Sequence, residues 1–177
     1  MNIEEELALA ARAKAGEKDA LGVLWDEITP KLYGYLINSL REPTLAEDIL
    51  QETWLKAISA LPKFRARGIR FSAWLFAIAR NECRQHWRRA GREIVGEIRE
   101  ENHPAALVFP ESALKEKIFT EELLKSLPEE DQEMLRLRYV AGLSFKEIAG
   151  VLEIAIITAR VRAHRALGRA RKILKNY

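Results

Sequence analysis

Apolar residues recur at intervals of three and four along almost the whole chain, and no stretch alternates apolar and polar residues as a strand would. This pattern predicts an all-α protein. Pro30 lies inside one apolar-periodic segment and predicts a kink or break in that helix. Because the other Pro and Gly residues divide the pattern, we expect four helices in the first half, over about residues 3–14, 19–39, 44–61 and 71–89.

The second half of the chain carries the outline of a helix-turn-helix. A helix opens at Pro128 and ends at Gly142. Ser144 precedes Glu147 by three residues, the spacing of a capping box in which each side chain bonds the other's backbone N–H. This box predicts the start of a short helix, FKEIAGVL. A turn at residues 153–155 and a long basic helix follow, which completes the outline.

A segment between the two halves has the composition of a linker. Residues 91–112 contain two Gly, two Pro and several acids. We therefore expect two small helical domains, residues 1–90 and 113–177, that fold separately. A linker of about 22 residues spans at most about 75 Å when extended, at roughly 3.3–3.6 Å per residue.

Charges segregate by sign along the chain, although the formal net charge is only +3. Acids dominate residues 1–52 and 93–122. Residues 63–92 are strongly basic, with Glu82 as the only acid, and residues 160–175 are basic without any acid. Two separated basic blocks on a nearly neutral chain indicate two sites for a polyanion such as DNA.

Several classes of function are not supported by the sequence. The single cysteine, Cys83, allows no intrachain disulfide and no Cys-based zinc site. The histidines are scattered, and no Gly-rich phosphate loop or nucleophile elbow is present. We therefore expect no catalytic residues, no metal and no cofactor, so that an enzyme is the weakest alternative.

The chain start, MNIEEELALAARAK, has neither the basic region nor the long apolar run of a signal peptide. No apolar run approaches the roughly 18 residues that span a bilayer. The expected location is the cytoplasm, with no direct membrane insertion.

The last helix is predicted to have one apolar and one basic face. An arginine side chain can bond a guanine edge or a phosphate at two points. A solvated helix surface is the alternative, but such surfaces usually mix signs to gain ion pairs one turn apart. The apolar stripe consists of Ile156, Ala159, Ala163, Ala166, Leu167, Ala170, Ile173 and Leu174. The face predicted to contact DNA carries Thr158, Arg160, Val161, Arg162, His164, Arg165 and Arg169.

Four segments, in this order, carry a resemblance to a known family: LAEDILQETWLKA, FSAWLFAIARNECRQHWRR, LPEEDQEMLRLRYVAGLSFKEIAGVLEI and TARVRAHRALGRAR. Together they resemble the sigma-70 family of bacterial RNA polymerase sigma factors and, in size, its extracytoplasmic-function class. The resemblance covers roughly residues 20–90 and 120–175.

The resemblance implies a factor that binds core RNA polymerase and directs it to promoters. The first domain would read and open the −10 element, and the second would read the −35 element. The expected partners are promoter DNA, the clamp helices of the largest polymerase subunit, the flap of the second-largest subunit, and an anti-sigma protein that holds the factor inactive.

The helix over residues 71–89 has a polar arc that suits melted DNA. Arginines would hold phosphates, amides would bond the edge of an unpaired base, and a ring would stack on it. By resemblance, Asn81 and the loop 63–70 would cradle a flipped −10 base. The alternatives are that Trp74 belongs to the core and that Asn81 is an ordinary surface amide. The residues predicted to contact the −10 element are Lys63, Arg65, Trp74, Arg80, Asn81, Arg84 and Arg88.

The helix over residues 44–61 is the predicted polymerase contact. Its core positions are Leu45, Ile49, Trp54 and Ile58, and another face is shared by Asp48, Gln51, Glu52 and Leu55. The resemblance implies that Asp48, Gln51 and Glu52 contact the clamp helices of the polymerase. The alternative is a solvated acidic helix start that the helix dipole favours.

The turn of the helix-turn-helix departs from the family pattern. The family usually has Gly where this chain has Glu153, and left-handed backbone costs a non-Gly residue roughly 1–2 kcal/mol. We therefore expect another turn geometry. Ile157 and Val161 could touch thymine methyl groups but cannot hydrogen-bond bases.

Two further alternatives remain open from the sequence. One is a dimeric helix-turn-helix regulator that binds a palindromic site. The other is a polymerase-binding protein that has lost promoter recognition, for which Glu153 is the argument.

Overall fold

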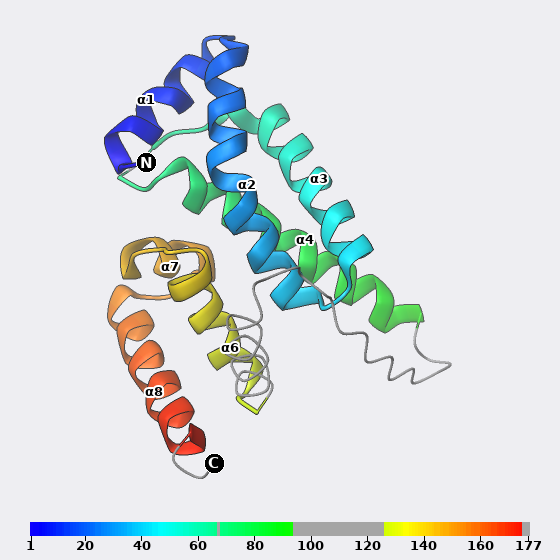
Figure 1. Cartoon of the computed structure of the whole chain (residues 1–177), viewed down its shortest axis with the longest axis vertical. Coiled ribbons are helices and arrows are strands. Elements are labelled where there is room, and N and C mark those ends of the chain that lie inside the picture. The colour runs from blue at the N-terminus through cyan, green and yellow to red at the C-terminus, as the bar shows by residue number, and fades with distance from the viewer. Residues whose placement is uncertain (67, 94–125, 175–177) are drawn as a thin grey trace, which may run out of the picture.

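The computed structural model describes residues 1–66, 68–93 and 126–174, and every regular element in these ranges is helical. Figure 1 shows the N-terminal helices and, beside them, the C-terminal group of helices. The all-α prediction is confirmed. The segment predicted as a linker lies outside the described residues, except that its first three residues continue α4.

The N-terminal helices follow the boundaries that Pro and Gly predicted to within a few residues. Pro30 lies inside the second helix without ending it, so of the predicted kink or break the break does not occur. Asn2 and Glu5 form a capping box at the first helix, with two N–H···O bonds of 2.9 Å. These helices are α1 (Ile3–Lys14), α2 (Lys18–Leu40), α3 (Pro43–Ala60), a 3-10 turn (Leu61–Lys63) and α4 (Phe71–Glu93).

The C-terminal helices form the predicted helix-turn-helix. The first, α6 (Glu129–Leu135), continues into a π turn, η2 (Arg136–Val140), and is followed by α7 (Phe145–Leu152) and α8 (Ile156–Leu174). The capping box of Ser144 and Glu147 at the start of α7 is confirmed.

The turn between α7 and α8 keeps the left-handed geometry despite its side chain. Glu153 has φ 57° and ψ 43°, so the expectation of another geometry is wrong. The N–H of Ile154 bonds the Ala149 carbonyl at 3.0 Å, and the Glu153 side chain is exposed to solvent. The backbone bonds that close α7 therefore hold a conformation that the residue type alone disfavours.

One hydrophobic core runs through both halves of the chain. It joins Leu36 and Phe76 of the N-terminal helices to Met134, Leu137 and Ile148 of the C-terminal group. A smaller cluster, with Leu127, Leu135, Ala166 and Ala170, lies between α6 and α8.

The halves also meet at a point where α2 lacks a side chain. A Cβ atom added at Gly34 would lie 3.4 Å from Cγ1 of Val140. The two predicted domains therefore pack directly on each other, which the sequence pattern did not indicate. Their separate folding stays a prediction.

Candidate nucleic-acid interface

The polar arc of α4 is only partly open to solvent. Asn81 and Arg84 are exposed, as is Arg88. Arg80 is half-buried, and its side chain points into the contact with the C-terminal helices. The predicted arc therefore exists, but its first arginine lies at the boundary between the two halves.

Trp74 belongs to an aromatic cluster. Its ring lies 5.0 Å from Phe64 and 5.4 Å from Phe71, measured between ring centroids, and the side chain is half-buried. Phe71 in turn lies 6.3 Å from Trp54. This packing favours the interpretation of Trp74 as a core residue that supports the loop before α4.

The loop before α4 is anchored at both ends by α1. Lys14 Nζ donates to the carbonyl of Phe64 at 3.1 Å, and the buried Glu6 carboxylate accepts from the backbone N–H of Ser72. Lys63 and Arg65, at the start of this loop, are exposed. The loop therefore exposes Lys63 and Arg65 to solvent while its backbone is held by contacts with α1.

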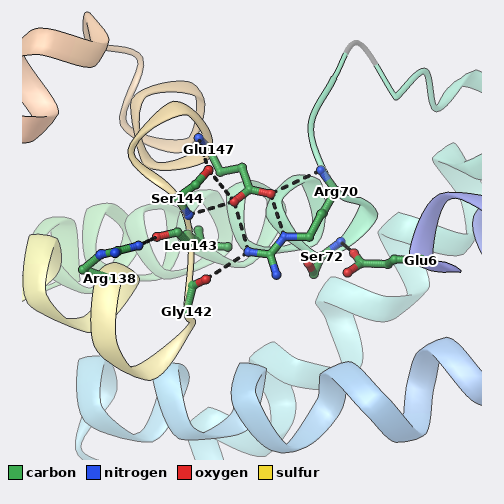
Figure 2. Close-up of polar contacts among 8 residues, drawn as sticks. All are labelled: Glu6, Arg70, Ser72, Arg138, Gly142, Leu143, Ser144 and Glu147. Atoms are coloured by element: carbon green, nitrogen blue, oxygen red, sulfur yellow. Dashed lines mark hydrogen bonds and ion pairs between the residues drawn. The ribbon is translucent and has the colours of Figure 1, made fainter. Parts of the chain in front are cut away.

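Arg70, at the end of the same loop, is bound to the helix-turn-helix. Its Nε lies 2.7 Å from Oε1 of Glu147, and its NH2 lies 3.0 Å from Oε2. Figure 2 draws both contacts. The same NH2 donates to the Gly142 carbonyl at 3.0 Å. Burial would raise the pKa of Glu147, but hydrogen bonds from Arg70 and Ser144 outweigh it and lower the pKa to about 2.

Arg80, like Arg70, pairs with a carboxylate of the C-terminal helices, in this case Glu133. Its Nε lies 3.3 Å from Oε1 of Glu133, and its NH1 donates to the Val151 carbonyl at 3.4 Å. The Tyr35 hydroxyl donates to the same Glu133 oxygen at 2.8 Å. Burial raises the pKa of Glu133, although the Tyr35 hydrogen bond and the nearby arginines oppose it. Two arginines of the first half are therefore paired with two acids of the second.

The basic face of α8 is largely exposed. Arg160, Val161, His164 and Arg165 are exposed, while Thr158 and Arg162 are half-buried. NH1 of Arg162 lies 3.8 Å from Oε2 of Glu130. Arg169 forms a bidentate ion pair with Asp131 of α6, through its Nε and NH2. Arg169 therefore connects α8 to α6, whereas the sequence placed it on the DNA face.

The apolar stripe of α8 is narrower than predicted. Ala159, Ala163, Ala166 and Ala170 are buried, and Leu167 and Ile173 are half-buried. Ile156 is 43% exposed, so its predicted burial is wrong. It lies in the first turn of the helix, next to Ile157, which is 74% exposed.

The predicted polymerase face of α3 is open. Asp48, Gln51, Glu52 and Leu55 are all exposed, Leu55 at 66%. Ile58, which the sequence assigned to the core, is 42% exposed, so that prediction is wrong. It lies three residues after Leu55, on the same side of the helix, and adds a second aliphatic side chain to this face.

Sequence reasoning missed the residues that join the two halves. Glu133, Gly34 and Val140 carried no signal, because contacts between distant segments leave no periodic trace. Glu147 was singled out only for its cap.

The described residues contain no group of three or more His, Cys, Asp or Glu side chains that could hold a metal ion. Within the same ranges no helix has both the length and the apolar character of a membrane span.

Two family models match the chain: Sigma-70 region 2 over residues 24–93, and Sigma-70, region 4, over residues 120–169. The ECF RNA polymerase sigma factor BldN of Streptomyces coelicolor is 34% identical over 172 residues, covering 92% of this chain and 64% of that relative. The ECF RNA polymerase sigma factor SigD of Mycobacterium tuberculosis is 35% identical over 170 residues, covering 92% of this chain and 80% of the relative.

Solved structures of similar fold cover most of the chain. CnrH in complex with the cytosolic domain of CnrY matches with a TM-score of 0.73 and 25% identity, over 97% of this chain and 98% of that one. The sigma factor RpoE of Bartonella quintana, in complex with the anti-sigma factor NepR, matches with a TM-score of 0.71 and 29% identity, over 88% and 96%.

Proposed function

This chain belongs to the extracytoplasmic-function class of the sigma-70 family of RNA polymerase sigma factors, and from that premise we propose that it binds core RNA polymerase and directs it to specific promoters. The observation that carries this proposal is the pair of separate basic faces, on α4 and on α8, each inside one of the two matched regions. The protein acts as an initiation factor in the cytoplasm, without a catalytic step of its own.

The first domain, residues 1–90, reads and opens the −10 element. Asn81 and Arg84 lie exposed within one turn of α4, where an amide can bond the edge of an unpaired base and a guanidinium its phosphate. Lys63 and Arg65 add cations from the anchored loop. Trp74 supports this loop through its contact with Phe64 and does not act as a stacking platform.

The second domain, residues 113–177, reads the −35 element with α8. Arg160 and Arg165 are exposed and can enter the major groove, where an arginine bonds guanine at two points. Ile157 and Val161 lie exposed beside them and suit contact with thymine methyl groups. We therefore expect a −35 element that contains both guanine and thymine.

The α3 face formed by Asp48, Gln51, Glu52 and Leu55 binds the clamp helices of the largest polymerase subunit, and the second domain binds the flap of the second-largest subunit. The face combines acids with an aliphatic side chain that is 66% exposed, Leu55. Exposed apolar side chains ringed by charge are typical of binding sites for protein partners.

An anti-sigma protein regulates the factor. The solved relatives CnrH and RpoE are each described in complex with another protein, the cytosolic domain of CnrY and the anti-sigma factor NepR. Both matches cover most of this chain, so the same kind of partner suits it.

Transcription from a promoter library by core RNA polymerase, with and without the protein, tests the proposal. We expect the protein to enrich transcripts whose promoters share a −10 and a −35 element at a fixed spacing. Enrichment without any shared element, or tight binding to palindromic duplexes in the absence of polymerase, would favour a conventional regulator instead.

A further inference from the structure

The exposed side of α8 is apolar at its centre, which is formed by Ile157 and Val161. Both side chains are exposed and lie one turn apart, within the first two turns of the helix. On a helix with about 100° per residue, both lie about 150–170° from the middle of the buried alanines of α8. In helix-turn-helix proteins the first residues of the second helix contact base edges, so the apolar centre lies where bases are read.

Packing within the chain gives no reason for two β-branched residues at these positions. Neither Ile157 nor Val161 belongs to a core cluster of the described residues. Ile and Val also form helix less readily than Ala, which occupies the buried positions of the same helix. A contact outside the chain therefore explains them better than a contact within it.

Cations flank the apolar centre. At about 100° per residue, Arg160 and Arg165 lie on opposite sides of it. Neither arginine forms an ion pair with the described residues, whereas Arg162 and Arg169 are paired with acids of α6. No acid occurs in residues 154–177. An apolar centre between two unpaired cations fits a DNA groove, where base edges lie between two rows of phosphates.

An aliphatic side chain can distinguish only one feature of a pyrimidine edge in the major groove. Thymine presents a C5-methyl group and the O4 acceptor there, whereas cytosine presents an N4 donor and no methyl group. Ile and Val side chains have neither a donor nor an acceptor, so they bond none of these polar atoms. They can bury the methyl group, and burying one group of that size favours binding by about fourfold.

We propose that Ile157 and Val161 recognise −35 pyrimidines through the C5-methyl group alone, so that 5-methylcytosine replaces thymine at the contacted positions. This inference rests on the proposed function, which puts α8 into the major groove of the −35 element. 5-Methylcytosine carries the same methyl group on the same ring carbon, and the apolar centre does not sense the polar atoms that distinguish the two bases. Methylation of a cytosine at such a position therefore strengthens a weak −35 element.

The test uses the full chain with core polymerase on one promoter from the library. At each −35 thymine in turn, the template carries thymine or deoxyuridine paired with adenine, or cytosine or 5-methylcytosine paired with guanine. Competition between templates for the complex measures their relative affinities. At two of these positions, we expect deoxyuridine and cytosine to bind about fourfold more weakly than thymine, and 5-methylcytosine to equal thymine.

Three variants assign the effect to side chains. Ile157→Ala should abolish the difference between thymine and deoxyuridine at one position, and Val161→Ala should abolish it at the other. Ile156→Ala removes the same atoms one residue earlier, closer to the buried alanines of α8, and is the matched control that keeps both differences. All three positions are exposed and alanine favours helix, so the variants keep the fold.

Several results would overturn the inference and leave the proposed function intact. They are promoter-specific transcription from a −35 element without thymine, equal affinity for the thymine and deoxyuridine templates, and a 5-methylcytosine template that binds like cytosine. Equal affinity would also be the result if the apolar centre binds a protein partner instead of DNA. A methyl effect that persists in both Ile157→Ala and Val161→Ala would belong to other residues and would overturn the inference too.

Failure to initiate at any specific promoter on unmodified DNA would instead contradict the proposed function, so the two failures are distinguishable.

Discussion

The buried carboxylate of Glu6 accepts a hydrogen bond from the backbone N–H of Ser72, the second residue of α4 (Figure 2). The first N–H groups of a helix have no partner within the helix, so a residue of α1 satisfies one at the start of α4. The family model for region 2 begins at residue 24, after α1. The first helix therefore contributes to the geometry of a matched region to which it does not belong.

Replacing Glu6 by Ala should destabilise the protein by about 1–3 kcal/mol, because it leaves a buried N–H without an acceptor. Glu6→Gln keeps an acceptor oxygen and should lose clearly less. Urea unfolding followed by circular dichroism measures both values. Equal losses in the two variants would show that the hydrogen bond to Ser72 does not contribute, and that only the carboxylate charge matters.

The ion pair between Arg70 and Glu147 should make stability depend on pH in a defined window. The pKa of Glu147 is lowered from 4.5 to about 2, so the pair contributes fully above 4.5 and is lost as the pH falls towards 2. Arg70→Ala should therefore cost about 1.5–3 kcal/mol near neutral pH, and less with each step below 4.5. A difference between wild type and variant that stays constant during acidification would contradict this assignment.

Charge reversal at Asp48 and Glu52 should weaken binding to core RNA polymerase and leave the helical circular dichroism intact, because both side chains are exposed. The double change Glu4→Lys and Asp26→Lys alters the net charge equally at exposed positions on α1 and α2 and serves as the control. Biolayer interferometry with immobilised core enzyme compares the two. Equal weakening by both doubles would indicate a nonspecific charge effect and remove the role of the α3 face.

Arg160 and Asn81 should affect different steps: Arg160 the recognition of the −35 element, and Asn81 the opening of the −10 element. Arg160→Ala should cost about 1–3 kcal/mol in binding if the arginine bonds a base, and pre-melting the −10 segment should not restore it. Asn81→Ala should bind the closed promoter normally but open it slowly, and a template pre-melted by mismatches should rescue it in part. Permanganate reactivity of the −10 thymines reports opening. Normal opening by Asn81→Ala on the matched template would leave it an ordinary surface amide.

Local signals in the sequence predicted the helices well, because caps and breakers act within a few residues. Ser144 and Glu147 form the predicted box, and Pro43 opens α3. Side chains near helix ends were harder to place: Ile58 and Ile156 have the right spacing for burial but extend past the packed faces.

The polar residues show a second limit of the sequence. Arg169 is part of a basic run, yet it pairs with Asp131, 38 residues away. Arg70 and Glu147 are 77 residues apart. Such pairs depend on how helices pack, and no short pattern encodes them. Glu153 marks the opposite case, where a rule for single residues predicted another geometry and the hydrogen bonds of the turn prevailed.

Run-off transcription on one promoter from the library tests the central claim, promoter-specific initiation with core RNA polymerase, most directly. The template is used intact, with the −10 element scrambled, and with the −35 element scrambled. We predict a discrete transcript from the intact template only when both the protein and core enzyme are present, and its loss when either element is scrambled. A transcript that persists after both elements are scrambled, or that core enzyme makes equally well alone, would contradict the account.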